Sequence, residues 1–147
     1  MIEAESTIDD SRITTFGRLF EANAKLSHLL ARDLVREFDL PLSWYGVLLH
    51  VGRSPGGIRP IGELISATAF TTGGVTRLVD RMERAGLVER RPCPSDRRVM
   101  YVGLTESGRA LLEKASAVHA QSIQRYLIDR LEPREVPELE RLLQKLV

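Results

Sequence analysis

The sequence predicts a mainly α-helical fold that carries one small β-hairpin. Two long segments near the ends of the chain repeat apolar residues with the period of an amphipathic helix. Between them, two shorter helical patterns are followed by a stretch in which apolar residues alternate with a period of two, which is typical of strands. At 147 residues, with 43% hydrophobic residues, the chain is long enough to bury a core, and we expect one domain over residues 1–147.

The first helix is expected to run from an N-cap at Ser11 to about Phe38. Pro41 ends it, because the residue before a proline is disfavoured in the α region. Its apolar residues form two rows, so more than one face must be buried, and a chain of this size cannot cover both faces by itself. A second helix, over 42–52, is nearly all apolar and is expected at the centre of the core. The two rows of the first helix are Ile13, Phe16, Phe20, Ala24, Leu30, Leu34 and Phe38, and Leu19, Leu26 and Leu29.

Two further helices are predicted in the middle of the chain, after a very short strand at Ile58–Arg59. The first covers about 60–67 and begins with a proline, which is favoured in the first turn of a helix. The second covers 72–85, with Thr71 as its N-cap and Gly86 as the glycine that ends it.

A hairpin follows, with strands at 87–91 and 97–104 and a proline-rich tip at 92–96. A long helix is expected over 105–130, with Thr105 as its N-cap. A final helix is expected to begin at Pro133. This order of elements is typical of a winged helix-turn-helix, in which the second helix of the pair enters the major groove of DNA.

The second middle helix has a polar face of the kind that suits DNA. Its first turn holds Gly73 and Gly74, each of which weakens a helix by about 1 kcal/mol relative to alanine. Close approach to a duplex explains them better than the alternative, which is neutral drift in a helix held by its tertiary contacts. The polar face consists of Thr72, Thr76, Arg77, Asp80, Arg81 and Arg84.

Four arginines surround the tip of the hairpin: Arg90, Arg91, Arg97 and Arg98, with Asp96 in the loop between them. Such a cluster repels itself unless an anion is near, and arginine inserted into a narrow minor groove is a known mode of DNA readout. The alternative is a solvated hairpin in which Asp96 pairs locally. The length and charge of the loop favour DNA.

The formal net charge of +1 hides an uneven distribution. Residues 1–52 carry 5 basic and 8 acidic side chains, residues 53–109 carry 10 and 6, and residues 110–147 carry 6 and 6. All ten basic residues of the middle segment are arginine, as are 18 of the 21 in the chain. Arginine suits bidentate contact with phosphate or guanine, although a general preference of the proteome for arginine is the alternative explanation.

Other classes of protein find no support. The single cysteine, Cys93, excludes an internal disulfide and a thiolate-rich zinc site, and no nucleophile with a histidine partner indicates catalysis. We therefore expect a protein that is not an enzyme and that holds no cofactor and no metal. No apolar run approaches the roughly 20 residues that span a bilayer. The N-terminus is acidic, unlike a signal peptide, so the expected compartment is the cytoplasm.

Several motifs of the middle segment together resemble one family. They are Ile61-Gly62-Glu63-Leu64, the run from Val75 to Glu83, the run from Gly86 to Arg90, the wing signature Asp96-Arg97-Arg98, and Leu104-Thr105-Glu106-Ser107-Gly108. Through these motifs residues 59–112 resemble the MarR family of winged-helix transcriptional regulators. The flanking long helices resemble the dimerisation elements of that family, so the resemblance extends over the chain after about residue 11.

The resemblance implies a homodimeric repressor that binds a pseudo-palindromic operator in double-stranded DNA. Residues 11–40 and 105–147 would supply the dimerisation helices, residues 42–104 would form the winged helix-turn-helix, and the partner subunit would cover the second apolar row. Arg98 corresponds to the wing arginine of the minor groove, and Asp96 to the acid that holds the wing arginines. The candidate DNA contacts are Thr71, Thr72, Gly73, Thr76, Arg77 and Arg81 in the helix, and Arg90, Arg91, Asp96, Arg97 and Arg98 in the wing.

Many members of that family release DNA when a small aromatic or phenolic anion binds between their dimerisation and DNA-binding regions. Candidate ligand residues here are His28, Trp44, Tyr45 and His50, and the alternative is that all four are core or satisfied polar residues. Three other functions remain open: a winged-helix protein-interaction module without DNA binding, a regulator that senses oxidants through Cys93, and a ligand-binding protein whose DNA contact is secondary.

Overall fold

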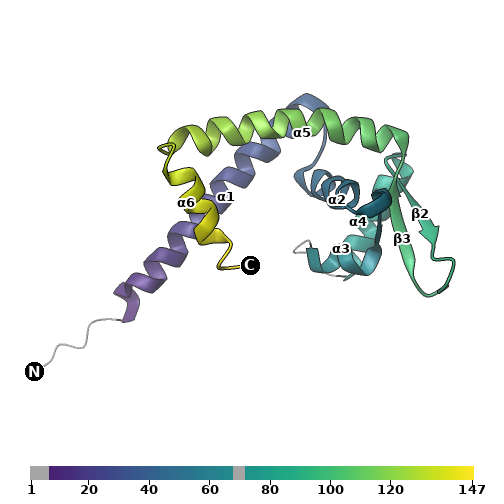
Figure 1. The fold of residues 1–147 in the computed structure, drawn as a ribbon, viewed down its shortest axis with the longest axis horizontal. Coiled ribbons are helices and arrows are strands. Elements are labelled where there is room, and N and C mark those ends of the chain that lie inside the picture. Colours follow the sequence, from purple (N-terminus) through teal and green to yellow (C-terminus); the bar gives the residue numbers. More distant parts are fainter. Residues whose placement is uncertain (1–6, 68–71) are drawn as a thin grey trace, which may run out of the picture.

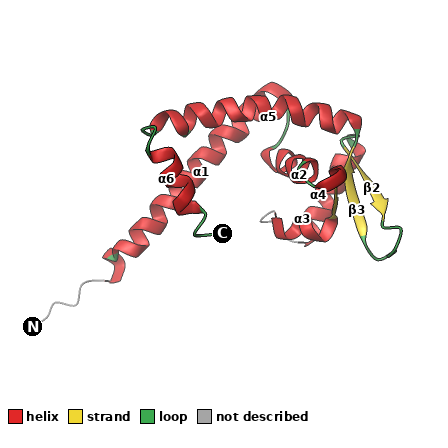
Figure 2. Ribbon diagram, viewed as in Figure 1, coloured by secondary structure: helices red, strands yellow, loops and turns green. Residues whose placement is uncertain are grey.

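The computed structural model describes residues 7–67 and 72–147. A long helix, α5, runs along the top of Figure 1, and α1 rises to meet it from the N-terminal end. The remaining elements of the middle of the chain lie below one end of α5, and the sheet forms their outer edge (Figure 2). The helices are α1 (Ser11–Phe38), α2 (Leu42–Gly52), α3 (Ile61–Ala67), α4 (Thr72–Arg84), α5 (Glu106–Tyr126) and α6 (Glu135–Leu143), and the strands are β1 (Ile58–Pro60), β2 (Val88–Pro92) and β3 (Met100–Leu104).

α1 has the predicted length, but its N-cap is Asp10 and not Ser11. The carboxylate of Asp10 accepts the backbone N–H of Arg12 at 2.8 Å. At the other end Asp39 adopts the left-handed conformation with φ 51°, which stops the helix before Pro41. The buried residues of α1 lie in its second half, whereas the first half exposes large apolar side chains. These exposed side chains are Ile13, Phe16, Leu19 and Phe20.

α2 lies at the centre of the core, as predicted, and contacts α1, α5 and the sheet. Its buried residues are Tyr45, Val47, Leu48 and Val51. The side of α4 that faces this core buries Val75, Leu78, Val79 and Met82. The core is completed by Leu34, Leu40, Leu64, Val88, Val102, Leu104, Leu112 and Ala115.

The three strands form one antiparallel sheet in the order β1-β3-β2. Pro60 pairs with Tyr101, so it ends β1 and does not begin the following helix as expected. β3 begins at Met100 and not at residue 97, because the N–H of Val99 donates to the carbonyl of Asp96 at 3.0 Å and closes a turn within the tip. The tip of the hairpin is therefore longer than predicted.

The C-terminal helices are shorter than predicted. α5 ends at Tyr126, and the chain continues into a 3-10 turn at Ile128–Arg130. α6 begins at Glu135 and not at Pro133, since the Glu135 carboxylate accepts the N–H of Glu132 at 2.7 Å and holds the preceding turn.

A tight corner joins the start of α5 to the end of α4. Gly86 has φ 72° and ends α4 as predicted. The hydroxyl of Thr105 donates to the carbonyl of Gly86 at 2.6 Å and accepts the N–H of Gly108 at 3.0 Å, so it caps α5 and joins the two elements. Gly108 lies directly against the backbone of Leu87: a Cβ at this position would lie 1.9 Å from the Leu87 carbonyl oxygen. The corner fixes the hairpin and α4 to α5.

Candidate nucleic-acid interface

α4 turns a polar, basic side away from the core. Thr76, Arg77, Arg81 and Arg84 are exposed, and three of them recur at the i, i+4, i+7 spacing of one helix face. Arg77, Asp80, Arg81 and Arg84 line a hollow of about 440 Å³ on this side. Arg84 lies on the same face, although it was not among the candidate DNA contacts. Its spacing from Arg77 and Arg81 in the sequence could have indicated this.

The first turn of α4 is only partly described. Thr71 lies outside the described residues, so its predicted role as N-cap has no structural counterpart here. Thr72 begins the helix. Gly73 is exposed, and a Cβ at this position would meet nothing within 4 Å. Packing inside the protein therefore does not require a glycine here, which leaves close approach to a ligand or neutral drift as its explanation.

Arg97 and Arg98 project from the tip of the hairpin into solvent. The Asp96 carboxylate accepts the backbone N–H of Arg98 at 2.9 Å and holds the tip in a turn. The Nε of Arg98 lies 3.6 Å from Asp96 Oδ1, and its side chain is 94% exposed. The acid thus fixes the backbone of the tip and leaves the guanidinium of Arg98 free to reach outward.

The expectation that all four wing arginines repel one another at the tip is wrong for Arg90 and Arg91. Arg91 pairs with Glu89 of its own strand, with a distance of 2.9 Å from Nε to Oε1. Arg90 turns towards α4 and binds Asp80 and Glu83. Burial alone would lower the pKa of Arg90, but the hydrogen bonds to the two carboxylates outweigh it and raise the pKa. The sequence could not show this, because all four arginines look alike in it.

Cys93 is half-buried in the tip, and its Sγ lies 3.2 Å from Ser95 Oγ. The hydrogen bond with Ser95, followed by backbone N–H groups, lowers the pKa of the thiol. Neighbouring hydrogen-bond donors, and not the arginines of the hairpin, cause this shift.

The candidate ligand residues are distributed over α1 and α2. Tyr45 is a core residue: its ring centroid lies 4.5 Å from that of His119, and its hydroxyl lies 3.2 Å from Ser116 Oγ. Trp44 is half-buried and packs against the core. His28 lines a hollow of about 470 Å³ with Ala31, Arg32, Val35 and Arg36. These observations agree with the core alternative for Tyr45.

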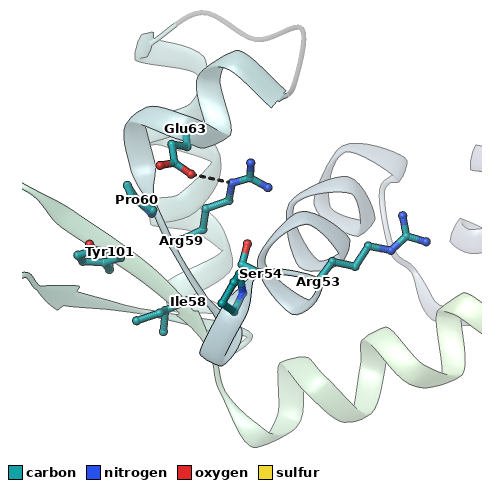
Figure 3. Close-up of a pocket in the computed structure, with 8 residues that line it drawn as sticks. Arg53, Ser54, Ile58, Arg59, Pro60, Glu63 and Tyr101 are labelled. Carbon is teal, nitrogen blue, oxygen red and sulfur yellow. Dashed lines mark ion pairs between the residues drawn. The ribbon is translucent and has the colours of Figure 1, made fainter. Parts of the chain in front are cut away.

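A third hollow lies where α2, β1 and α3 meet (Figure 3). Its volume is about 450 Å³, and Arg59 Nε lies 3.4 Å from Glu63 Oε2 beside it. His50 lies on α2, three residues before Arg53, which lines this hollow. Burial, with smaller effects of Arg59 and Arg53, lowers the pKa of His50. The sequence did not indicate this hollow, because only the pairing of β1 with β3 brings Tyr101 to it. It is lined by Arg53, Ser54, Pro55, Ile58, Arg59, Pro60, Glu63 and Tyr101.

Over residues 7–67 and 72–147, no group of three or more histidine, cysteine, aspartate or glutamate side chains could hold a metal ion. Within the same ranges, none of the helices has the length and apolar character needed to cross a membrane.

Comparisons with known proteins agree on one family. Residues 38–99 match the model of the MarR family. The chain is 33% identical to the multiple antibiotic resistance protein MarR of Salmonella typhimurium over 138 residues, which cover 93% of this chain and 94% of that protein. The structure resembles AbsC, a MarR family transcriptional regulator from Streptomyces coelicolor, with a TM-score of 0.84, 31% identity, and coverage of 93% and 92% of the two chains. It also resembles a mutant MarR from E. coli complexed with operator DNA, with a TM-score of 0.80, 31% identity, and coverage of 92% and 96%.

Proposed function

Because the chain belongs to the MarR family of transcriptional regulators, we propose that it binds double-stranded DNA, with α4 in the major groove and the hairpin tip in the minor groove. As a member of this family it is a regulator and not an enzyme. The proposed contacts in α4 are Thr72, Gly73, Thr76, Arg77, Arg81 and Arg84, and those at the tip are Arg97 and Arg98 with Asp96 as their support. Thr71, which precedes α4 in the sequence, is also a proposed contact. Such a regulator would work in the cytoplasm, the compartment expected from the sequence.

The observation that carries the proposal is a set of exposed arginines on α4 and at the tip whose charge the protein does not neutralise. Over the described part of the chain, only one of them has a carboxylate within 4 Å, namely Arg98, at 3.6 Å from Asp96. Uncompensated arginine is suited to phosphate and guanine. The core of a protein-binding face would carry aromatic and apolar side chains and few charges, which argues against the interaction module. The set consists of Arg77, Arg81, Arg84, Arg97 and Arg98.

The salt dependence of binding tests the DNA-binding role. Duplexes that the purified protein selects from a random pool are titrated in mobility-shift assays from 50 to 200 mM salt. We expect affinity to fall steeply, since a protein that neutralises about six phosphates loses roughly a thousandfold over this range. An interaction module would select no duplex, or would bind duplexes with an affinity that salt barely changes.

We also propose that the functional unit is a homodimer. The first half of α1 and the end of the chain expose large apolar side chains, whose burial would contribute roughly 25 cal/mol for each Å² removed from water. A second copy related by a two-fold axis would cover them, and would place two α4 helices in major grooves about 34–36 Å apart. The exposed side chains are Ile13, Phe16, Leu19, Phe20, Leu142, Leu143 and Leu146.

Sedimentation equilibrium at micromolar protein tests the homodimer. We expect a mass of about 33 kDa, twice the 16.5 kDa of the chain. The selected duplexes should contain two half-sites spaced by one turn of DNA. A mass of one chain over the whole concentration range, with a single half-site in the selected DNA, would contradict this proposal.

We further propose that the protein acts as a repressor that a small aromatic or phenolic anion releases from DNA. This part is supported by the family resemblance. The positions of Trp44, Tyr45 and His50 on the core helix do not identify the binding site of such a ligand, while His28 lines an open hollow on α1. Repeating the DNA selection with candidate aromatic acids is the corresponding assay.

A further inference from the structure

Arg90 lies on β2 and joins two carboxylates of α4. Its Nη2 donates to Asp80 Oδ1 and its Nη1 to Glu83 Oε2, both at 2.5 Å. Its backbone N–H donates to Glu83 Oε1 at 3.1 Å. The side chain is 22% exposed, against 55% for Arg91 and 94% for Arg98. Arg90 is thus directed into the protein, whereas the tip arginines are directed outward.

We propose that Arg90 is a positioning residue that holds the wing against α4 and does not itself contact DNA, an inference that rests on the DNA-binding role proposed above. Asp80 and Glu83 are three residues apart, so they are neighbours on one side of α4. The planar guanidinium bridges both carboxylates through two different nitrogen atoms. The backbone bond attaches β2 to the same carboxylate. Arg90 thereby sets the distance between the two elements that carry the proposed groove contacts.

The ion pairs of Arg90 with Asp80 and Glu83 also compensate negative charge beside the arginines that are proposed to contact phosphate. Asp80 lines the hollow that also contains Arg77, Arg81 and Arg84. Without Arg90, the charge of Asp80 would oppose the approach of a phosphate to these arginines. Arg90 therefore supports DNA binding in two ways, through geometry and through charge.

A phosphate contact by Arg90 would exclude this arrangement. The guanidinium would have to leave Asp80 and Glu83, and would give up the two charge-assisted hydrogen bonds that its Nη atoms donate. The two carboxylates would then repel the phosphate that Arg90 had moved to bind. The observed contacts therefore favour the protein partners over DNA.

A double-mutant cycle on the full chain tests the proposal. Arg90→Gln is made in the parent and in the Asp80→Asn, Glu83→Gln background, and affinity for a selected duplex is measured over a salt series. We expect a loss of about tenfold in the parent and less than about twofold in the neutral background, because there the carboxylates no longer need a partner. The slope of log affinity against log salt should keep its parent value, since no phosphate contact is lost.

Arg97→Gln is the matched comparison, because it makes the same change at an exposed arginine of the tip. There we expect the slope to decrease by about 0.9, the value for one phosphate contact. Arg90→Lys is a second variant, in which a single ammonium nitrogen replaces the two guanidinium nitrogens that bind Asp80 and Glu83. It should bind DNA with an affinity between those of the parent and Arg90→Gln.

Three results would overturn the positioning role. A slope that decreases by about 0.9 in Arg90→Gln, or an equal loss of affinity in both backgrounds, would assign Arg90 to a phosphate contact. A lower Tm with unchanged DNA affinity would leave Arg90 with a structural role alone. Thermal unfolding without DNA measures the same coupling independently, and Arg90→Gln should lower the Tm in the parent more than in the neutral background. If the parent binds no DNA, the proposed function fails as well; if it binds DNA and the cycle shows no coupling, the positioning role fails alone.

Discussion

Replacing Arg98 by alanine is expected to weaken DNA binding by roughly 1–3 kcal/mol, which is about 5- to 150-fold in the dissociation constant. The side chain is 94% exposed at the tip of the hairpin, so its loss removes no packing inside the protein. The backbone of the tip is held separately, by the bond from the Arg98 N–H to Asp96. The variant should therefore keep the Tm and the oligomeric state of the parent, and only its affinity for DNA should change.

Two control variants show which property of Arg98 is needed for DNA binding. Arg98→Lys keeps the charge but loses the planar guanidinium, so it separates attraction to phosphate from the shape of the groove contact. Asp96→Ala removes the support of the turn while the arginine stays, and it should cost less than the loss of Arg98. If Arg98→Ala binds the selected duplex as tightly as the parent, the wing has no part in DNA binding.

Replacing Gly108 by alanine should destabilise the fold by roughly 3 kcal/mol or more. The added Cβ would lie 1.9 Å from the Leu87 carbonyl oxygen, which is backbone and cannot rotate away as a side chain can. That carbonyl also accepts the N–H of Thr105 at 3.2 Å, so any shift disturbs the cap of α5 as well. For a chain of this length we expect the Tm to fall by about 10 °C, measured by circular dichroism.

Gly62→Ala is the matched control, since Gly62 lies in α3 and a Cβ there would meet nothing within 4 Å. It should leave the Tm unchanged, or raise it slightly, because alanine favours a helix by about 1 kcal/mol relative to glycine. An unchanged Tm in Gly108→Ala would mean that the corner between α4, β2 and α5 is loose enough to accommodate a methyl group.

Local chemistry made much of the fold predictable. The nearly all-apolar stretch after Pro41 predicted α2, and Gly86 ended α4 because a positive φ favours glycine. Tertiary pairing decided the elements that the sequence misplaced. Pro60 became part of β1 because it lies opposite Tyr101, and β3 was shortened because Val99 bonds within the tip.

The sequence predicted the position of some arginines of the site and not of others. The spacing of Arg77 and Arg81 placed them on the polar side of α4, and both are exposed there. Arg90 and Arg98 belong to the same run of positive charge, yet one is held by α4 and the other is open to solvent. Partners that lie 7 and 10 residues before Arg90 become visible only when β2 packs against α4.

The exposed basic surface of α4 and the tip is built from arginine alone. The three lysines of the chain, Lys25, Lys114 and Lys145, lie on α1, on α5 and after α6. Lysine acetylation, which removes positive charge from many DNA-binding surfaces, therefore has no target here. The positive charge of this surface is thus not subject to removal by lysine acetyltransferases.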